Sequence, residues 1–216
     1  MIGNRIGHRL DPYLMALLKT FFADRGNPNF FTFMGFLVTL AASLFILKES
    51  WILAGMAIIL SGLFDLFDGV VARTLGMVTA FGGFLDSVLD RYSDLFLLLA
   101  LIIHYLKQGN SSLVILTSFV SIGTALIPYI RAKAETIQVP CTIGFMERAE
   151  RIILLAAGAL FGWMEGILWI LAVLTHFTIL QRIWYVWKTL RLSAEPSNPK
   201  SQIPNPKQDP NVNCKP

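Results

Sequence analysis

Charged residues are scarce in this sequence of 216 residues, and the scarcity decides its broad class. Only 15% of the residues are charged, 55% are hydrophobic and the mean hydropathy is +0.60. A typical soluble domain carries roughly 25% charged residues. The composition therefore excludes an ordinary soluble domain and predicts one polytopic membrane domain.

Cysteine is nearly absent as well. Cys141 and Cys214 can build neither a disulfide framework nor the closely spaced ligand set of a structural metal site. The N-terminal sequence lacks the compact apolar core of a cleavable signal peptide, so none is expected. The net charge of +4 is accounted for by membrane orientation, and no nucleic-acid partner is expected.

What the sequence has instead is long apolar runs. A run of roughly 20 apolar residues can cross a bilayer as a helix. Such runs occupy residues 30–47, 51–72, 80–106, 111–130, 150–165 and 166–187. The last two are nearly continuous, and only the region from Gly162 to Gly166 indicates a turn between them. With that turn we expect an all-α polytopic protein with six transmembrane helices, and without it five.

The distribution of cations favours six spans. The short loops near Lys48 and Lys107 hold one cation each, whereas most lysines and arginines lie on the other side or at depth within the spans. By the positive-inside rule, both termini and the loop around residues 131–151 are cytoplasmic. We therefore expect a multi-pass protein of the cell membrane with a cytoplasmic active site.

Three segments are expected along the chain. Residues 1–28 form an interfacial region in which residues 4–22 read as an amphipathic helix on the membrane surface, although an ordinary solvated helix fits as well. Residues 29–192 form the membrane domain. Residues 193–216 are rich in proline and poor in apolar residues, so we expect a disordered cytoplasmic tail.

Five aspartates interrupt the apolar sequence that leads from the second predicted span into the third. They are Asp65, Asp68, Asp86, Asp90 and Asp94. A charged side chain near the middle of a bilayer costs roughly 2.5–3.5 kcal/mol on insertion scales. Such a cost, repeated several times, requires a compensating partner.

Four of these acids predict a metal site. On a helix, Asp65 and Asp68 project from one face because they are three residues apart, and Asp86 and Asp90 do so because they are four apart. The glycine-containing segment 74–83 predicts a turn that folds the second helix back toward the first. Four converging carboxylates form the all-oxygen ligand set that hard cations such as Mg²⁺ prefer, and two cations could share them.

The same residues form a recognisable signature. The pattern Asp-x2-Asp-Gly-x2-Ala-Arg-x8-Gly-x3-Asp-x3-Asp over residues 65–90 resembles that of the CDP-alcohol phosphotransferases in every fixed letter and gap. The resemblance implies a six-helix membrane enzyme, usually a homodimer. It transfers a substituted phosphate from a CDP-alcohol to an acceptor hydroxyl and releases CMP, with two Mg²⁺ ions, or Mn²⁺, per active site.

The resemblance also assigns roles to individual residues. Asp65, Asp68 and Asp86 would bind the metals, and Asp90 would complete the metal site and act as the general base. The positions that match contacts to the CDP-lipid are Asn29, Phe30, Phe31, Thr32, Gly69, Arg73 and Thr79. Asp94 lies outside the signature and is expected either to pair with Arg91 or to support the site from behind.

A second group of charges lies downstream. Arg131, Lys133, Arg148 and Arg151 gather at the cytoplasmic end of the fourth and fifth predicted spans, and Arg182 lies within the sixth. Positive-inside anchoring could explain the loop residues. It explains Arg182 poorly, because apolar sequence surrounds that residue and an intramembrane arginine is a functional candidate.

These cations suggest which acceptor is used. The segments YIRAKAE, GFMERAER and LQRIWYVW resemble the branch of phosphatidylinositol-phosphate and archaetidylinositol-phosphate synthases, in which such cations bind the acceptor phosphate. The order of Arg131 and Lys133 is reversed, and Pro128 replaces a small hydroxyl residue. Inositol 1-phosphate is the expected acceptor, and glycerol 3-phosphate is the rival.

Two kinds of protein other than an enzyme could also carry these acids. Intramembrane carboxylates could line a cation channel or transporter, but that predicts acids spread over several spans rather than clustered on two. A catalytically dead scaffold would not need the complete set of acids.

Overall fold

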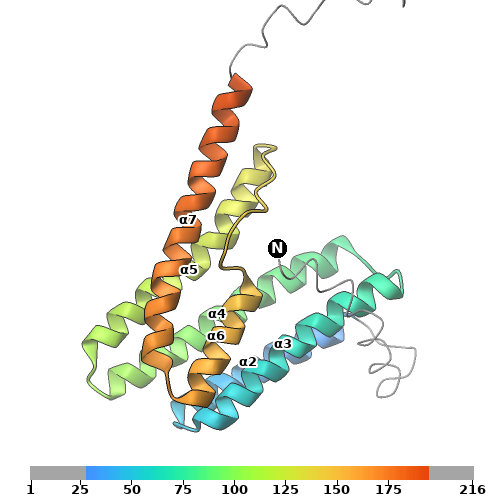
Figure 1. The fold of residues 1–216 in the computed structure, drawn as a ribbon. Helices are drawn as coiled ribbons and strands as arrows, with labels where there is room; N and C mark the ends of the chain where they lie inside the picture. Colours follow the sequence, from blue (N-terminus) through green and yellow to red (C-terminus); the bar gives the residue numbers. More distant parts are fainter. Residues whose placement is uncertain (1–27, 195–216) are drawn as a thin grey trace, which may run out of the picture.

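The structure, a computed structural model, describes residues 28–194, and every regular element in that range is a helix (Figure 1). The helices are α2 (Pro28–Leu47), α3 (Trp51–Thr74), α4 (Ala80–Lys107), α5 (Ser111–Thr136), α6 (Arg148–Phe161) and α7 (Met164–Ala194). The predicted all-α class is thus confirmed for this part of the chain. The predicted interfacial helix over residues 4–22 and the tail beyond Ala194 lie outside the described residues.

Short turns join most of the helices. Gly162 takes a left-handed conformation with φ of 69° and ends α6, so the turn predicted near this residue is confirmed. The turn between α3 and α4 uses Gly76 at φ of 64°. Gly82 and Gly83, which the sequence placed in that turn, instead lie in the first turn of α4.

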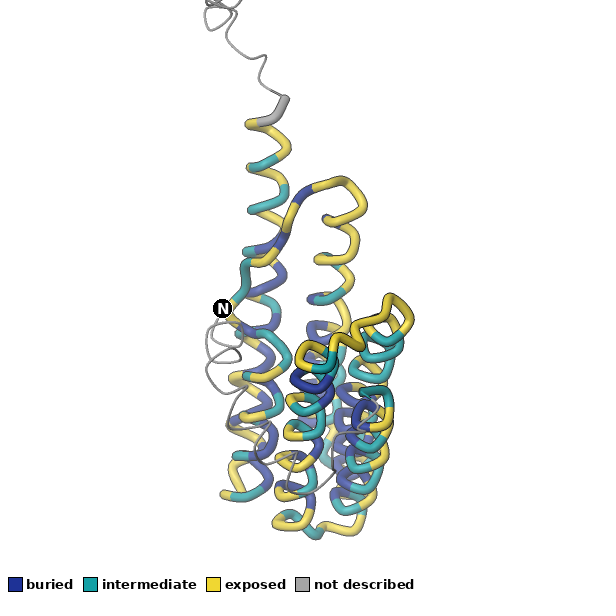
Figure 2. The backbone as a smooth tube through the Cα atoms, turned by 90° about the vertical axis from the view of Figure 1, so that its right-hand side faces the viewer, coloured by how far each residue is buried: buried dark blue, intermediate teal, exposed yellow. Residues whose placement is uncertain are grey.

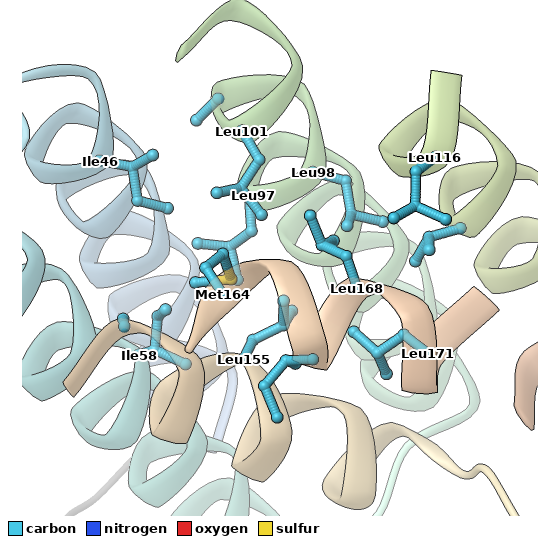
Figure 3. Close-up of a cluster of buried hydrophobic side chains, with 14 of the residues drawn as sticks. Ile46, Ile58, Leu97, Leu98, Leu101, Leu116, Leu155, Met164, Leu168 and Leu171 are labelled. Carbon is cyan, nitrogen blue, oxygen red and sulfur yellow. The ribbon is translucent and has the colours of Figure 1, made fainter. Parts of the chain in front are cut away.

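The core lies where the helices pack against one another. α2 packs on α3 and α4, α3 on α6, α4 on α5, and α7 on both α5 and α6. Leu98 and Leu101 of α4 and Leu168 and Leu171 of α7 are among the fully buried side chains at its centre (Figure 3). Many large apolar side chains remain exposed on the outer faces, as expected of a protein whose solvent is lipid (Figure 2).

Four of the described helices, namely α2, α3, α5 and α7, are long and apolar enough to cross a membrane. α4 carries Asp86, Asp90, Arg91 and Asp94 between residues 86 and 94. α6 has 14 residues and is therefore about 21 Å long, shorter than the roughly 30 Å of a bilayer core. By length and composition alone, four of the described helices qualify as membrane spans, and the remaining two predicted spans stay predictions.

α5 and α7 project together beyond the other helices, and the chain returns from α5 to α6 through residues 137–147 (Figures 1 and 2). Val139 and Cys141 of this loop are buried with Ala134 of α5 in a small apolar cluster. Burial raises the pKa of the Cys141 thiol, which keeps it protonated and unreactive. The cluster anchors the loop that leads into the N-terminal end of α6, where Arg148 and Arg151 lie.

Candidate active site

The structure brings together the four predicted metal ligands. Asp65 and Asp68 lie near the C-terminal end of α3, and Asp86 and Asp90 lie near the N-terminal end of α4. Asp86 lies near enough to Asp65 and Asp68 for their negative charges to repel. Asp65 and Asp90 repel each other in the same way. Carboxylates from two helices therefore share one partly buried region, as the spacing predicted.

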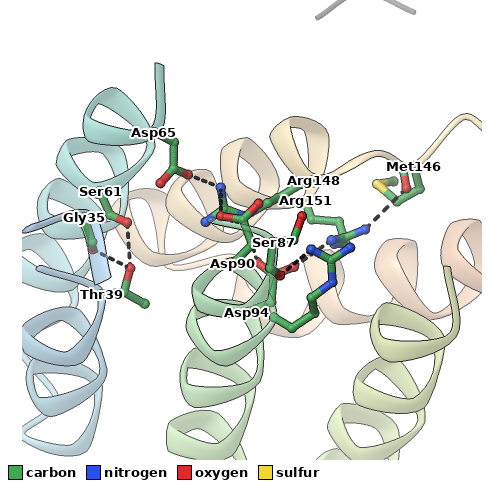
Figure 4. A network of polar contacts seen from close by, with 11 residues as sticks. Gly35, Thr39, Ser61, Asp65, Ser87, Asp90, Asp94, Met146, Arg148 and Arg151 are labelled. Atoms are coloured by element: carbon green, nitrogen blue, oxygen red, sulfur yellow. Dashed lines mark hydrogen bonds and ion pairs between the residues drawn. The ribbon is translucent and has the colours of Figure 1, made fainter. Parts of the chain in front are cut away.

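Arg148 lies in the middle of these acids. Its Nη1 contacts the carboxylate of Asp65 and lies 2.9 Å from Asp90 Oδ1, while its Nε lies 3.6 Å from Asp94 Oδ1 (Figure 4). Several half-buried carboxylates attract a cation more strongly than a solvated surface does. Arg148, predicted in the acceptor-phosphate pocket, is therefore placed among the acids instead.

The acids fit a divalent cation. Oδ2 of Asp68 is buried and has no hydrogen-bond partner, which is costly for a carboxylate unless a cation completes its environment. As the side chains stand, no three metal-ligating residues within 28–194 form a ready-made cage, because Asp65 and Asp90 are both turned onto Arg148. The chemistry of the donor set fits Mg²⁺ or Mn²⁺.

Some of the residues predicted to contact the CDP-lipid converge beside the acids. Arg73 folds back over Gly69, where an added Cβ would lie 3.2 Å from Arg73 Nη1. Thr79 caps α4 by accepting a hydrogen bond of 3.0 Å from the Gly82 backbone N–H. An added Cβ on Gly82 would also lie 3.1 Å from Asn29 Oδ1, so the N-terminal ends of α2 and α4 meet at this glycine.

Two further predicted contacts are placed differently. Phe31 is completely buried and its ring packs against Phe64 and Phe67. It therefore belongs to a small apolar cluster with Val70 and Val71 of α3, and its ring is not exposed for contact with a ligand. The Thr32 hydroxyl lies within hydrogen-bonding reach of Asp68 and 3.2 Å from the Pro28 carbonyl oxygen. Phe30 is about half exposed beside them.

Two buried arginines hold the loop between α5 and α6. Arg182 is 3% exposed, and its Nε and Nη1 donate to the carbonyl oxygens of Ile143 and Ile127 at 2.8 and 2.6 Å. Arg151 donates from Nη1 to the Met146 carbonyl oxygen at 3.4 Å. These backbone contacts, which the sequence did not reveal, fix the Arg182 guanidinium in place and give Arg151 one long main-chain contact.

Asp94 pairs with arginines of α6 and not with Arg91. Its Oδ2 lies 2.6 Å from Arg151 Nη2 (Figure 4). Arg91 is exposed and donates to the carbonyl oxygen of Ser87 in its own helix. The expected Asp94–Arg91 pair is therefore wrong, and the expected support of the site from behind describes Asp94 better.

The remaining predicted cations lie on the exposed end of α5. Arg131 forms an exposed pair with Glu135, at 3.1 Å between Nε and Oε1, and Lys133 is exposed nearby. Arg182 is repelled by both Arg131 and Arg151, so these three positive charges face one region. Arg151, which pairs with Asp94, links this group of positive charges to the acids of α4.

Gly144 is a feature that sequence reasoning missed. Its φ of 149° lies in a region that disfavours side chains, and an added Cβ would lie 2.9 Å from Thr178 and 3.2 Å from both Nε and Nη2 of Arg182. The Thr178 hydroxyl in turn accepts the Met146 backbone N–H at 3.2 Å. A glycine inside an otherwise apolar loop was the signal that could have revealed this close packing.

We expect Gly144→Ala to lower stability by roughly 1–3 kcal/mol, because the new methyl group needs a strained backbone and displaces Arg182. Thermal unfolding of the purified protein in detergent measures the effect. Gly166→Ala is the matched control, because Gly166 is helical and an added Cβ there meets nothing within 4 Å. An equal unfolding temperature for both variants would contradict the proposed packing.

A family profile described as CDP-alcohol phosphatidyltransferase matches residues 26–181. The sequence is 40% identical over 170 residues to the archaetidylinositol phosphate synthase of Methanothermobacter thermautotrophicus, across 76% of this chain and 84% of that protein.

Two crystal structures of phosphatidylinositol phosphate synthase from Mycobacterium tuberculosis are similar to this fold. The one with CDP-DAG bound has a TM-score of 0.71 and 29% sequence identity, covering 85% of this chain and 94% of that one. The one in complex with manganese and citrate has a TM-score of 0.70 and the same identity of 29%, covering 82% and 88%.

Proposed function

The chain belongs to the CDP-alcohol phosphatidyltransferase family, and we propose that it transfers the phosphatidyl group, or the equivalent ether-lipid phosphate, of a CDP-lipid to inositol 1-phosphate. It is an enzyme of phospholipid biosynthesis whose chemistry depends on a metal ion. The observation that carries the acceptor assignment is the placement of buried Arg151 against Asp94 of α4, with buried Arg182 near enough to Arg151 for their charges to repel. The relatives named archaetidylinositol phosphate synthase and phosphatidylinositol phosphate synthase support it.

The reaction exchanges one phosphorus–oxygen bond for another. The acceptor hydroxyl oxygen bonds to the lipid-linked phosphorus, the bond from that phosphorus to the CMP oxygen breaks, and CMP leaves. The hydroxyl proton passes to a carboxylate, which we assign to Asp90. Asp90 is only about one-fifth exposed and lies at the junction between the acids and the arginines. A general base must lie within hydrogen-bonding reach of the hydroxyl whose proton it takes.

The four acids of α3 and α4 would hold the metal. Asp65, Asp68, Asp86 and Asp90 would bind two divalent cations, Mg²⁺ or Mn²⁺. When bound, the cations would neutralise the diphosphate charge and favour attack at phosphorus. Asp68, with its unpaired buried oxygen, is the ligand for which the structure offers the strongest support.

The donor and acceptor halves of the site use different residues. On the donor side, Arg73 lies over Gly69 and can present a planar fork to a phosphate, while Asn29 and Thr79 meet at Gly82. On the acceptor side, Arg151 and Arg182 provide fixed positive charge, and Arg131 and Lys133 lie at the exposed edge. Transfer between two phosphorylated substrates requires both groups to hold their substrate at the acids.

We also propose that all six described helices cross the membrane and that both termini and the active site face the cytoplasm. α4 and α6 pack against helices that are long enough to span, and the charges of α4 are compensated by arginines of α6. Such pairing lowers the cost of intramembrane charge. A homodimer in the cell membrane is the assembly expected from the family resemblance.

A panel of acceptors with one CDP-lipid tests the assignment. We expect CMP release with inositol 1-phosphate to exceed release with free inositol, because charge-assisted hydrogen bonds to a phosphate contribute roughly 1.5–3 kcal/mol each. One such bond corresponds to a kcat/KM for inositol 1-phosphate at least about tenfold higher than that for free inositol. Turnover of glycerol 3-phosphate but not of inositol 1-phosphate would overturn the acceptor and leave the family unchanged.

A further inference from the structure

Asp94 lies one helical turn beyond the last acid of the signature and is 8% exposed. Its two oxygens face different arginines of α6. Oδ2 is 2.6 Å from Arg151 Nη2, and Oδ1 is 3.6 Å from Arg148 Nε. Asp94 therefore stands between the arginine that contacts the acids and the arginine of the acceptor side.

Arg151 depends on this contact more than Arg148 does. Arg148 is shared by Asp65 and Asp90 as well, so it keeps partners without Asp94. The carboxylate paired with Arg151 is that of Asp94, and Arg151 is only 6% exposed. A buried guanidinium that loses its carboxylate is strongly destabilised and moves to find another.

Arg151 also keeps donor capacity for a ligand. Its Nη2 is engaged by Asp94 and its Nη1 makes only a long contact of 3.4 Å to the Met146 carbonyl oxygen, while its buried Nε has no hydrogen-bond partner. A guanidinium held along one edge can offer its remaining donors to a phosphate in a fixed geometry.

We propose that Asp94 is a positioning residue for the acceptor phosphate, acting by fixing the guanidinium of Arg151. This inference rests on the proposed function, because it needs a phosphorylated acceptor. Asp94 itself touches neither substrate. It keeps Arg151 on the acceptor side and away from Asp65 and Asp90, whose negative charge would otherwise attract the freed guanidinium.

The test is equilibrium binding of inositol 1-phosphate and, separately, of CDP-lipid to the full-length protein in detergent with Mn²⁺ present. Asp94→Asn should weaken binding of inositol 1-phosphate about tenfold or more, since one charge-assisted contact is misplaced. Binding of CDP-lipid should stay within about twofold of wild type. Asp94→Glu should recover part of the loss because it restores the carboxylate.

A matched control removes one carboxylate elsewhere. Glu165 is exposed in the first turn of α7, at the end of α6 opposite Arg148 and Arg151, so Glu165→Gln should change neither affinity. Arg151→Lys and the double variant complete a cycle, and the effects of Asp94→Asn and Arg151→Lys should be strongly non-additive. Full additivity would overturn the proposal, because it would mean that the two residues act independently.

Failure of the inference can be told apart from failure of the proposed function. If Asp94→Asn weakens both substrates equally, or neither, the positioning role is wrong while the acceptor assignment stands. If the wild type prefers glycerol 3-phosphate, the acceptor is wrong, and the same variants measured with that phosphate still decide the role of Asp94. A wild type that binds no phosphorylated acceptor would overturn both.

Discussion

Treatment with EDTA is expected to abolish CMP release, and added Mg²⁺ or Mn²⁺ is expected to restore it. The four acids of α3 and α4 repel one another across a partly buried region, and Arg148 supplies only one positive charge to them. A single guanidinium cannot also neutralise a diphosphate. Loss of the metal should therefore reduce activity to background, measured as CMP released from a CDP-lipid.

A binding measurement separates the metal site from the chemistry. Asp68→Asn should lower the affinity for Mn²⁺ about tenfold or more, because it removes the charge of the carboxylate whose Oδ2 is buried without a partner. Glu165→Gln, distant from the acids, should leave Mn²⁺ affinity unchanged. Full activity in the presence of chelator, or equal Mn²⁺ affinity in both variants, would contradict the metal assignment.

The helices themselves could be predicted closely from the sequence. The predicted spans 51–72 and 80–106 begin at the same residues as α3 and α4. The predicted spans 111–130 and 166–187 end too early, because α5 continues to Thr136 and α7 to Ala194. Hydropathy detects where a helix meets lipid, whereas the backbone hydrogen bonds continue into polar sequence beyond the membrane.

The acids of the site were predictable and their partners were not. Helical spacing places Asp86 and Asp90 on one face whatever surrounds them, and glycine and arginine at fixed intervals identify the family. The pairing of Arg148 with Asp65 joins residues 83 positions apart, and that of Arg151 with Asp94 joins residues 57 apart. Such contacts depend on how α6 packs against α3 and on the path of the loop before it.

The cations downstream show the same limit. Sequence correctly singled out Arg182 as unusual, since it interrupts an apolar helix. It could not show that two of the nitrogens of Arg182 bind main-chain carbonyls, because those carbonyls belong to α5 and to the loop. Arg182 is thus a structural clamp as well as a candidate for the acceptor phosphate, and its replacement would affect folding. Asp94 offers a more selective test of that pocket.

Asp90→Asn is expected to lower turnover by about 10²-fold or more while CDP-lipid still binds. Asparagine keeps the shape of the side chain but cannot take a proton from the acceptor hydroxyl, and losing a general base typically costs 10²–10⁴-fold. Because Asp90 is also a proposed metal ligand, turnover is measured across a Mn²⁺ titration. If saturating Mn²⁺ restores near-normal turnover, Asp90 only holds metal and the base lies elsewhere. If the deficit persists at saturation with donor affinity intact, the loss lies in the chemical step, as expected for the residue at the junction of the acids and Arg148.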